Sequence, residues 1–349
     1  SFMKKMGIVL LAALAALSIG TAAAEGVKID GIIKAGETKT ILAPYSGVIG
    51  DYTAQVGDEA SAGDALFTLK AQKVYAEFDG TVTAVFAQGG DNASSVSARY
   101  GALAYIEEVL YRAECSTANS EGGNENKIVH VGETVYIRST GDSDRVGEAR
   151  VIGVSGKSYT LEVTKQDDIR IGESIKVYRN DHYYGSSCIG SGKVERVDPQ
   201  AVSAEGYVLS TSVEEGQHVS RGDVLFDVVP DALDDMEGGN GHVYMQEDGI
   251  LLSVTAESGT QAAKDTVLAA YCPKDAMRLV CSVDEQDITE IQVGDVMTVT
   301  LDAYEDKPLR GVVTKIAAAG EDGGAFYDVT LELEENDIMR IGMSASAEK

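Results

Sequence analysis

The sequence contains no tryptophan, and only 5 of its 349 residues are proline. Basic residues are also scarce, with 29 lysines and arginines against 56 acidic residues and a net charge of −27. A surplus of this size repels phosphate backbones, which argues against nucleic acid as a partner. The 38 glycines, and the frequent alternation of β-branched with polar residues, predict a mostly β chain of short strands joined by glycine turns.

Several motifs of catalysis are also missing. There is no CxxC pair, no HExxH helix motif and no GxSxG elbow, and the four histidines are scattered along the chain. These absences argue against a zinc or redox site, a catalytic metal and a hydrolase. We therefore expect a protein that is not an enzyme and that binds no cofactor and no metal.

The N-terminal segment has the features of an export signal. Lys4 and Lys5 precede an apolar run from Gly7 to about Ile19, and small residues follow up to Ala24. The run is just long enough to span a bilayer, so residues 1–24 form either a cleaved signal peptide or a retained membrane anchor. We expect an exported, extracytoplasmic and membrane-associated protein.

An exported chain can keep disulfides, and this one has four cysteines. We favour pairing Cys115 with Cys188, which bracket one predicted domain, and Cys272 with Cys281, which flank a short Pro-Lys-Asp turn. Four unpaired buried thiols are the alternative.

An internal duplication organises the chain. The stretch "SGVIGDYTAQVGDEASAGDALF" has glycines at 47, 57 and 63, and "EGYVLSTSVEEGQHVSRGDVLF" repeats the same steps at 206, 216 and 222. The following "VYAEFDGTVTAVFAQGGD" resembles "VYMQEDGILLSVTAESGT", except that the second copy is preceded by ten extra residues in an acidic loop. Further on, residues 131–177 resemble residues 293–346. The order of modules is therefore A-B-A′-B′.

These modules resemble a known family. "ILAPYSGVIGDYTAQVGDEASAGDALFTL" is similar to the biotinyl/lipoyl-like domain of HlyD-type periplasmic adaptor (membrane fusion) proteins, and "LVCSVDEQDITEIQVGDVMTVTLDAYEDKPLRGVVTKI" with "MRIGMSAS" is similar to their β-barrel domain. The resemblance implies an all-β fold, a tandem duplication of lipoyl-like sandwiches (flattened barrels) and small β-barrels. We expect lipoyl-like domains at 27–110 and 187–273, and barrels at 127–180 and 277–349. Members of the family usually carry a long α-helical hairpin between the two lipoyl halves, for which Lys70 to Lys73 leaves room only for a turn.

Lys73 is a candidate for modification. It lies at the expected crest of a β-hairpin, where carrier domains hold a biotinylated or lipoylated lysine, but the second copy has no matching lysine. A solvated turn lysine is the preferred interpretation, and a carrier-type enzyme component modified at Lys73 is the alternative.

Two arginines are candidate partner contacts. Arg170 and Arg340 each precede the Ile-Gly that enters a final barrel strand, with Asp168 or Asp337 a few residues earlier. A structural ion pair that shapes the turn is the simpler interpretation, and contact with a transporter or a neighbouring protomer is the functional one.

The sequence as a whole predicts an adaptor. The resemblance implies a membrane-associated subunit of an efflux or secretion transporter, with an ABC-type permease as partner and with homo-oligomers held by the lipoyl-like units. A module that binds wall polymer or peptide through tyrosine-bearing barrel faces remains the alternative binding function.

Overall fold

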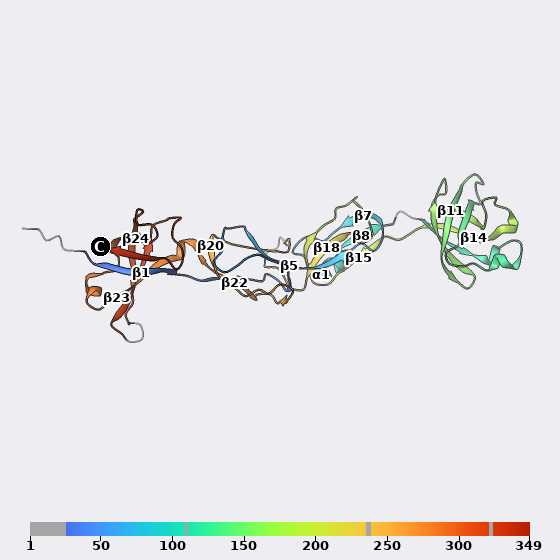
Figure 1. The fold of residues 1–349 in the computed structure, drawn as a ribbon. Helices are drawn as coiled ribbons and strands as arrows, with labels where there is room; N and C mark the ends of the chain where they lie inside the picture. Colours follow the sequence, from blue (N-terminus) through green and yellow to red (C-terminus); the bar gives the residue numbers. More distant parts are fainter. Residues whose placement is uncertain (1–25, 109–110, 235–238, 321–323) are drawn as a thin grey trace, which may run out of the picture. The chain divides into compact units, whose positions relative to one another are not determined.

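The structure is a computed structural model that describes residues 26–108, 111–234, 239–320 and 324–349. The described residues form two closed six-stranded barrels and four further small sheets (Figure 1). This confirms the expected all-β fold. The chain divides into two compact units, one made of the residues up to Lys39 with Cys272–Lys349, and the other of Thr40–Tyr271. Within the described ranges, no helix is both long enough and apolar enough to cross a membrane.

The first unit is a closed barrel, here called the C-terminal barrel. Its strand order is β1-β23-β26-β25-β24-β27, so a strand from the start of the chain closes a barrel built by its end. Figure 1 shows β1, in blue, among the red strands. The expected domain at 277–349 is therefore extended by β1, because β1 pairs with both β23 and β27. The strands are β1 (Lys28–Ala35), β23 (Met277–Asp284), β24 (Val296–Leu301), β25 (Leu309–Ile316), β26 (Phe326–Leu333) and β27 (Ser344–Glu348).

The middle barrel lies within the second unit and has the order β10-β11-β12-β9-β14-β13. It is larger than the expected 127–180, because β9 and β14 pair with each other and close it. Alternation buries one face of each strand, as in β12, where Tyr159, Leu161 and Val163 point inward. The strands are β9 (Tyr111–Ser116), β10 (Thr134–Ser139), β11 (Val146–Ser155), β12 (Ser158–Lys165), β13 (Ser174–Tyr178) and β14 (Cys188–Arg196).

The two barrels have the same neighbour relations but begin at different strands. β9 to β13 correspond to β23 to β27, whereas β14, last in the middle barrel, corresponds to β1, first in the C-terminal barrel. One close contact repeats in both. Gly31 lies opposite Cys281 and Gly192 lies opposite Cys115, and a Cβ at these glycines would come within 2.7 Å and 2.5 Å of the sulfur. The barrels are circular permutations of one another.

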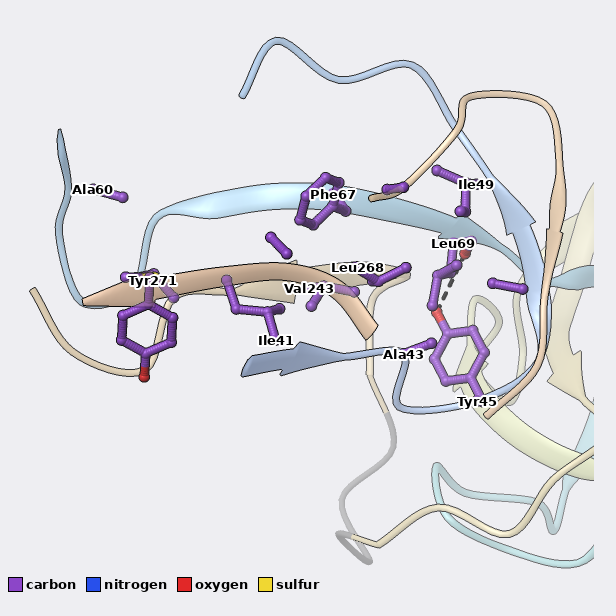
Figure 2. Packing of buried hydrophobic residues seen from close by; sticks show 14 of the residues in the cluster. Ile41, Ala43, Tyr45, Ile49, Ala60, Phe67, Leu69, Val243, Leu268 and Tyr271 are labelled. Atoms are coloured by element: carbon purple, nitrogen blue, oxygen red, sulfur yellow. Dashed lines mark hydrogen bonds between the residues drawn. The ribbon is translucent and has the colours of Figure 1, made fainter. Parts of the chain in front are cut away.

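The first sandwich combines segments from both ends of the second unit. One sheet has the order β19-β5-β3-β21 and the other β2-β22-β20-β4, and a core that includes Ile41, Phe67, Val243 and Leu268 lies between them (Figure 2). The strands are β2 (Lys39–Leu42), β3 (Gly47–Ile49), β4 (Glu59–Ala60), β5 (Ala65–Lys70), β19 (His242–Tyr244), β20 (Gly249–Val254), β21 (Gln261–Ala262) and β22 (Val267–Pro273).

The second sandwich has matching sheets, β16-β18-β6 and β15-β8-β7-β17, around a core that contains Phe226. It differs by helix α1 (Ala93–Tyr100), which lies between β7 and β8 and begins where the Asn92 side chain accepts from the Ser95 amide. The strands are β6 (Gln72–Tyr75), β7 (Gly80–Val85), β8 (Ala104–Glu107), β15 (Gln200–Val202), β16 (Tyr207–Thr211), β17 (His218–Val219) and β18 (Val224–Val229). Short 3-10 turns lie at Thr117–Asn119, Asn124–Lys127, Gly185–Ser187, Lys274–Ala276 and Asp287–Glu290.

The two copies exchange their halves. The first half of copy A (β2–β5) packs with the second half of copy A′ (β19–β22), and the second half of A (β6–β8) packs with the first half of A′ (β15–β18). The expected contiguous lipoyl-like domains 27–110 and 187–273 are therefore wrong in their pairing, although both copies are present. The physical reason is Ala71, the single residue between β5 and β6. One residue is too short for a hairpin, so β6 continues into the next sandwich.

Candidate functional site

The surfaces of the sandwiches are positioned by hydrogen bonds that join the exchanged halves. The Gly57 amide donates to the Leu251 carbonyl at 2.8 Å, and the equivalent Gly216 amide donates to Val82 at 2.7 Å. Both glycines have positive φ, +91° and +83°, which explains why the turn motif requires glycine. The repeated glycines thus connect one copy to the other.

The Asp-Gly pairs of the two copies make the same contact reciprocally. Asp248 Oδ1 accepts from the Ala62 amide at 2.8 Å, and Asp79 Oδ1 accepts from the Arg221 amide at 2.8 Å. Each bond joins residues more than a hundred positions apart in the chain. Their equal geometry indicates that both sandwiches are stabilised in the same way.

Lys73 is not on a hairpin crest. It lies in β6 opposite Asp227 of β18, and its Nζ is 3.0 Å from Asp227 Oδ1. The side chain is 47% exposed. The expected hairpin is wrong, because the single residue Ala71 between β5 and β6 is too short to form one. A lysine that is paired across two strands is held in place, whereas a swinging prosthetic arm needs an unattached turn lysine.

Arg170 lies in the turn between β12 and β13, and its backbone amide donates to Glu173 Oε2 at 3.1 Å. Glu173 also accepts from the guanidinium of Arg145. Burial opposes ionisation of Glu173, yet the Arg170 amide and the Arg145 guanidinium together hold its pKa below the usual value. The carboxylate therefore fixes the turn, and the side chain of Arg170 lies exposed on it.

Arg340 occupies the equivalent turn of the C-terminal barrel and is also exposed. Its Nη1 donates to the backbone carbonyls of Asp337 and Met339, at 3.0 Å and 3.1 Å. The Asp337 carboxylate lies 3.5 Å from Lys274 Nζ instead. Across the described chain, no ion pair joins Arg340 to Asp337 or Arg170 to Asp168. The simpler ion-pair interpretation is therefore wrong, and the role as partner contacts stays a prediction.

All four cysteines are buried free thiols, so the expected disulfides are not formed. Cys115 of β9 faces Gly192, four positions along β14 from Cys188, and Cys281 of β23 faces Gly31. The members of each expected pair therefore do not lie opposite one another. Burial raises the pKa of Cys115 and of Cys281 to about 12, which keeps these thiols protonated and unreactive.

The acidic loop of the second copy is the return connection from β18 to β19. Asp231 accepts from the Ser46 amide at 2.6 Å, and these contacts with Ser46 lower the pKa of Asp231. Lys264 Nζ donates to Asp234 at 2.7 Å and to the Ala232 carbonyl at 2.8 Å. The ten extra residues noted in the sequence thus include an anchored connection between the sandwiches, part of which, 235–238, lies outside the described residues.

A cleft of 430 Å³ lies beside this connection on the first sandwich. Tyr45, Val243 and Tyr271, drawn in Figure 2, contribute to its lining. The Tyr45 hydroxyl donates to the Leu69 carbonyl at 3.2 Å, and burial, followed by the charge of Asp227, raises its pKa to about 12. The Tyr271 hydroxyl donates to Glu247 Oε1 at 2.9 Å, so both tyrosine hydroxyls are already bonded within the sandwich and chiefly give the cleft its shape.

Sequence patterns missed a cluster of aromatic and basic side chains on the middle barrel. The Arg138 guanidinium lies 4.0 Å from the ring centroid of Tyr183, which meets Tyr178 edge to face at 5.4 Å. Tyr183 has φ of +54°, an uncommon backbone conformation for an aromatic residue. The three residues follow no regular spacing in the sequence. The one local sign of the cluster is the stretch "HYYG", in which two tyrosines precede a glycine.

No protein-family model matches the chain, and no curated protein does so either. Several solved structures are similar. ZneB from Cupriavidus metallidurans shares 17% identity over 93% of this chain and 97% of its own, with a TM-score of 0.36. The periplasmic adaptor protein EmrA shares 19% over 31% of this chain and 33% of its own, with a TM-score of 0.27. The membrane fusion protein Spr0693 from Streptococcus pneumoniae R6 shares 19% over 34% of this chain and 52% of its own, with a TM-score of 0.26.

The names of EmrA and Spr0693 belong to the family that the sequence motifs resemble, that of periplasmic adaptor and membrane fusion proteins.

Proposed function

We propose that this protein is an exported, membrane-associated adaptor subunit of an efflux or secretion transporter and that it acts through protein–protein contacts without catalysis. The observation that carries the proposal is the path of the chain. β1 enters the C-terminal barrel, β2–β5 form half of a sandwich, residues 71–241 intervene, and β19–β22 complete the sandwich before the chain returns to the barrel. Members of the family that the sequence resembles likewise carry an insertion, a helical hairpin, between the two halves of their lipoyl-like domain.

The position of the family's helical hairpin is occupied by a second module. The second sandwich and the middle barrel lie within residues 71–241, between the two halves of the first sandwich. An adaptor built in this way presents a second β-barrel where its relatives present a coiled coil. Its contacts are therefore β surfaces, and the partner that we favour is an ABC-type permease.

The exposed arginines of the equivalent barrel turns test this proposal. We expect Arg170→Glu and Arg340→Glu to abolish co-purification of a permease from native membranes that the unchanged protein captures after cross-linking. Lys157→Glu and Lys307→Glu are matched controls, because both lysines are exposed and lie on other loops. Capture that is equally strong with all four variants would contradict a role for these turns, and capture of no membrane transporter by the unchanged protein would contradict the adaptor function.

The cluster of Arg138, Tyr178 and Tyr183 supports the second candidate, a module that binds wall polymer. Tyr178 is only 7% exposed, so half-buried Tyr183 beside Arg138 is the ring available to a sugar that carries anionic groups. Purified cell wall should retain the protein, and Tyr183→Ala should reduce the retention while Tyr304→Ala, on the C-terminal barrel, leaves it unchanged. Equal retention of both variants would eliminate this candidate.

A further inference from the structure

The outer face of the C-terminal barrel carries an exposed aliphatic pair. Ile32 of β1 is 45% exposed and lies directly opposite Val280 of β23, which is half-buried. Both line a shallow groove of 560 Å³ that also reaches Ser344 of β27. Ile29 and Ile33 of the same strand are buried, so the outward position of Ile32 follows from the alternation of β1 and contributes little to the core.

Carboxylates surround this pair. Asp30, Asp302 and Asp328 line the same groove. Across the described residues, none of these three side chains takes part in an ion pair or a hydrogen bond, whereas Lys34 is the one basic residue of the lining. The groove therefore combines an apolar floor with three carboxylates that outnumber its one lysine and that are not paired with any described residue.

The middle barrel provides an internal comparison. Because Gly31 corresponds to Gly192 and Cys281 to Cys115, Ile32 corresponds to Lys193 and Val280 to Glu114. Lys193 lies opposite Glu114 in the register. The same barrel therefore forms with a polar, charged pair at these positions. The aliphatic pair is not required for the fold, and an exposed apolar patch rimmed by polar residues is typical of an interaction site.

We propose that this face of the C-terminal barrel docks a positively charged segment of another protein. An aliphatic side chain of that segment covers Ile32 and Val280, and its lysines or arginines pair with Asp30, Asp302 and Asp328. Charge decides against a second copy of this chain, since the whole chain has a net charge of −27. Like charges would repel two copies, whereas a basic segment is attracted. The proposal holds whether or not the chain is a transporter adaptor.

A defined peptide tests the groove in the full chain. The probe is a fluorescent eight-residue peptide of alternating lysine and valine, and its binding is measured by anisotropy at low and at high salt. We expect the double variant Ile32→Asn with Val280→Thr to bind the probe at least about tenfold more weakly, because the aliphatic contact is lost. The double variant Asp30→Asn with Asp328→Asn should show a smaller salt dependence.

Two controls distinguish binding in this groove from nonspecific attraction of a basic peptide to an acidic protein. Val296 of β24 is 51% exposed and lies outside the groove, so Val296→Thr should bind the probe normally. A peptide of alternating lysine and serine should bind the unchanged protein more weakly than the probe. Equal binding of the two peptides, or equal binding by the Ile32/Val280 variant and Val296→Thr, would overturn the proposal. Thermal unfolding followed by circular dichroism verifies that each variant is folded.

Discussion

Truncation of Phe67 and of Phe226 distinguishes exchanged halves from contiguous domains. The two phenylalanines occupy equivalent positions in β5 and β18 and are 2% and 0% exposed. Phe67 belongs to the core shared by β2–β5 and β19–β22, and Phe226 to the core shared by β6–β8 and β15–β18. Each alanine substitution should therefore weaken one sandwich and spare the other.

The expected magnitude is large enough to resolve. Replacing a buried phenylalanine by alanine costs about 3–5 kcal/mol, from lost transfer energy and the cavity left behind. At about 1.4 kcal/mol per factor of ten, the slowest amides of the affected sandwich should exchange about a hundredfold to several thousandfold faster. Hydrogen exchange followed by mass spectrometry measures these rates for each peptide of the chain. Phe67→Ala should accelerate exchange in 242–273 and leave 72–107 unchanged, and Phe226→Ala should do the reverse.

The refuting result is equally specific. If Phe67→Ala accelerated exchange in 72–107 and spared 242–273, the halves of one copy would pair with each other, and the chain path on which the proposed function depends would be lost. Phe67→Leu, a smaller change in volume, provides the same comparison if the alanine variant does not fold.

Three further predictions concern single contacts. The pKa of Glu173 is lower in the folded protein than its ordinary value of 4.5, so its stabilisation is present above that pH and is lost as pH falls through the folded pKa. Glu173→Gln should therefore flatten the decline in the urea midpoint of the middle barrel as the pH falls below 4.5. All four cysteines should resist an alkylating reagent in the native protein and all four should react in denaturant, whereas a disulfide would leave two unmodified. Asp248→Ala should destabilise the first sandwich, and Asp79→Ala the second, by about 1 kcal/mol each in urea unfolding.

The sequence predicted the strands better than their partners. The spacing of glycines and the alternation of apolar residues revealed both copies, because both patterns are set by residues close together in the sequence. Gly57 and Gly216 carry the same turn motif, however, so either copy's second half satisfies either first half equally well. Which halves pair depends on the linker between β5 and β6. This linker is the single residue Ala71, which is too short to reverse the direction of the chain. The sequence between Lys70 and Lys73 is compatible with a turn, and only the strand bounds show that a single residue separates β5 from β6.

The candidate site was predicted only in part. Arg170 and Arg340 lie in equivalent exposed turns, as the shared Ile-Gly indicated, but their hydrogen bonds differ because Glu173 has no counterpart at Met343. The cysteine pairs were wrong because spacing along the chain reports neither strand register nor sheet membership. Cys115 and Cys188 lie on the paired strands β9 and β14 but four positions out of register, and Cys272 and Cys281 lie on strands of different sheets. The apolar pair at Ile32 and Val280 joins β1 to β23, far apart in sequence, and only barrel closure brings them together.

The duplication produced two barrels with one topology and different surfaces. Residues 111–196 carry 12 basic and 13 acidic side chains, a net charge of 12 − 13 = −1, whereas residues 28–35 with 277–349 carry 8 and 17, a net charge of 8 − 17 = −9. The middle barrel bears the cluster of Arg138 and Tyr183, and the C-terminal barrel bears the acidic apolar groove. If both barrels served only to support the sandwiches, nothing would favour this divergence of charge. Barrels that contact two chemically different partners would diverge in this way.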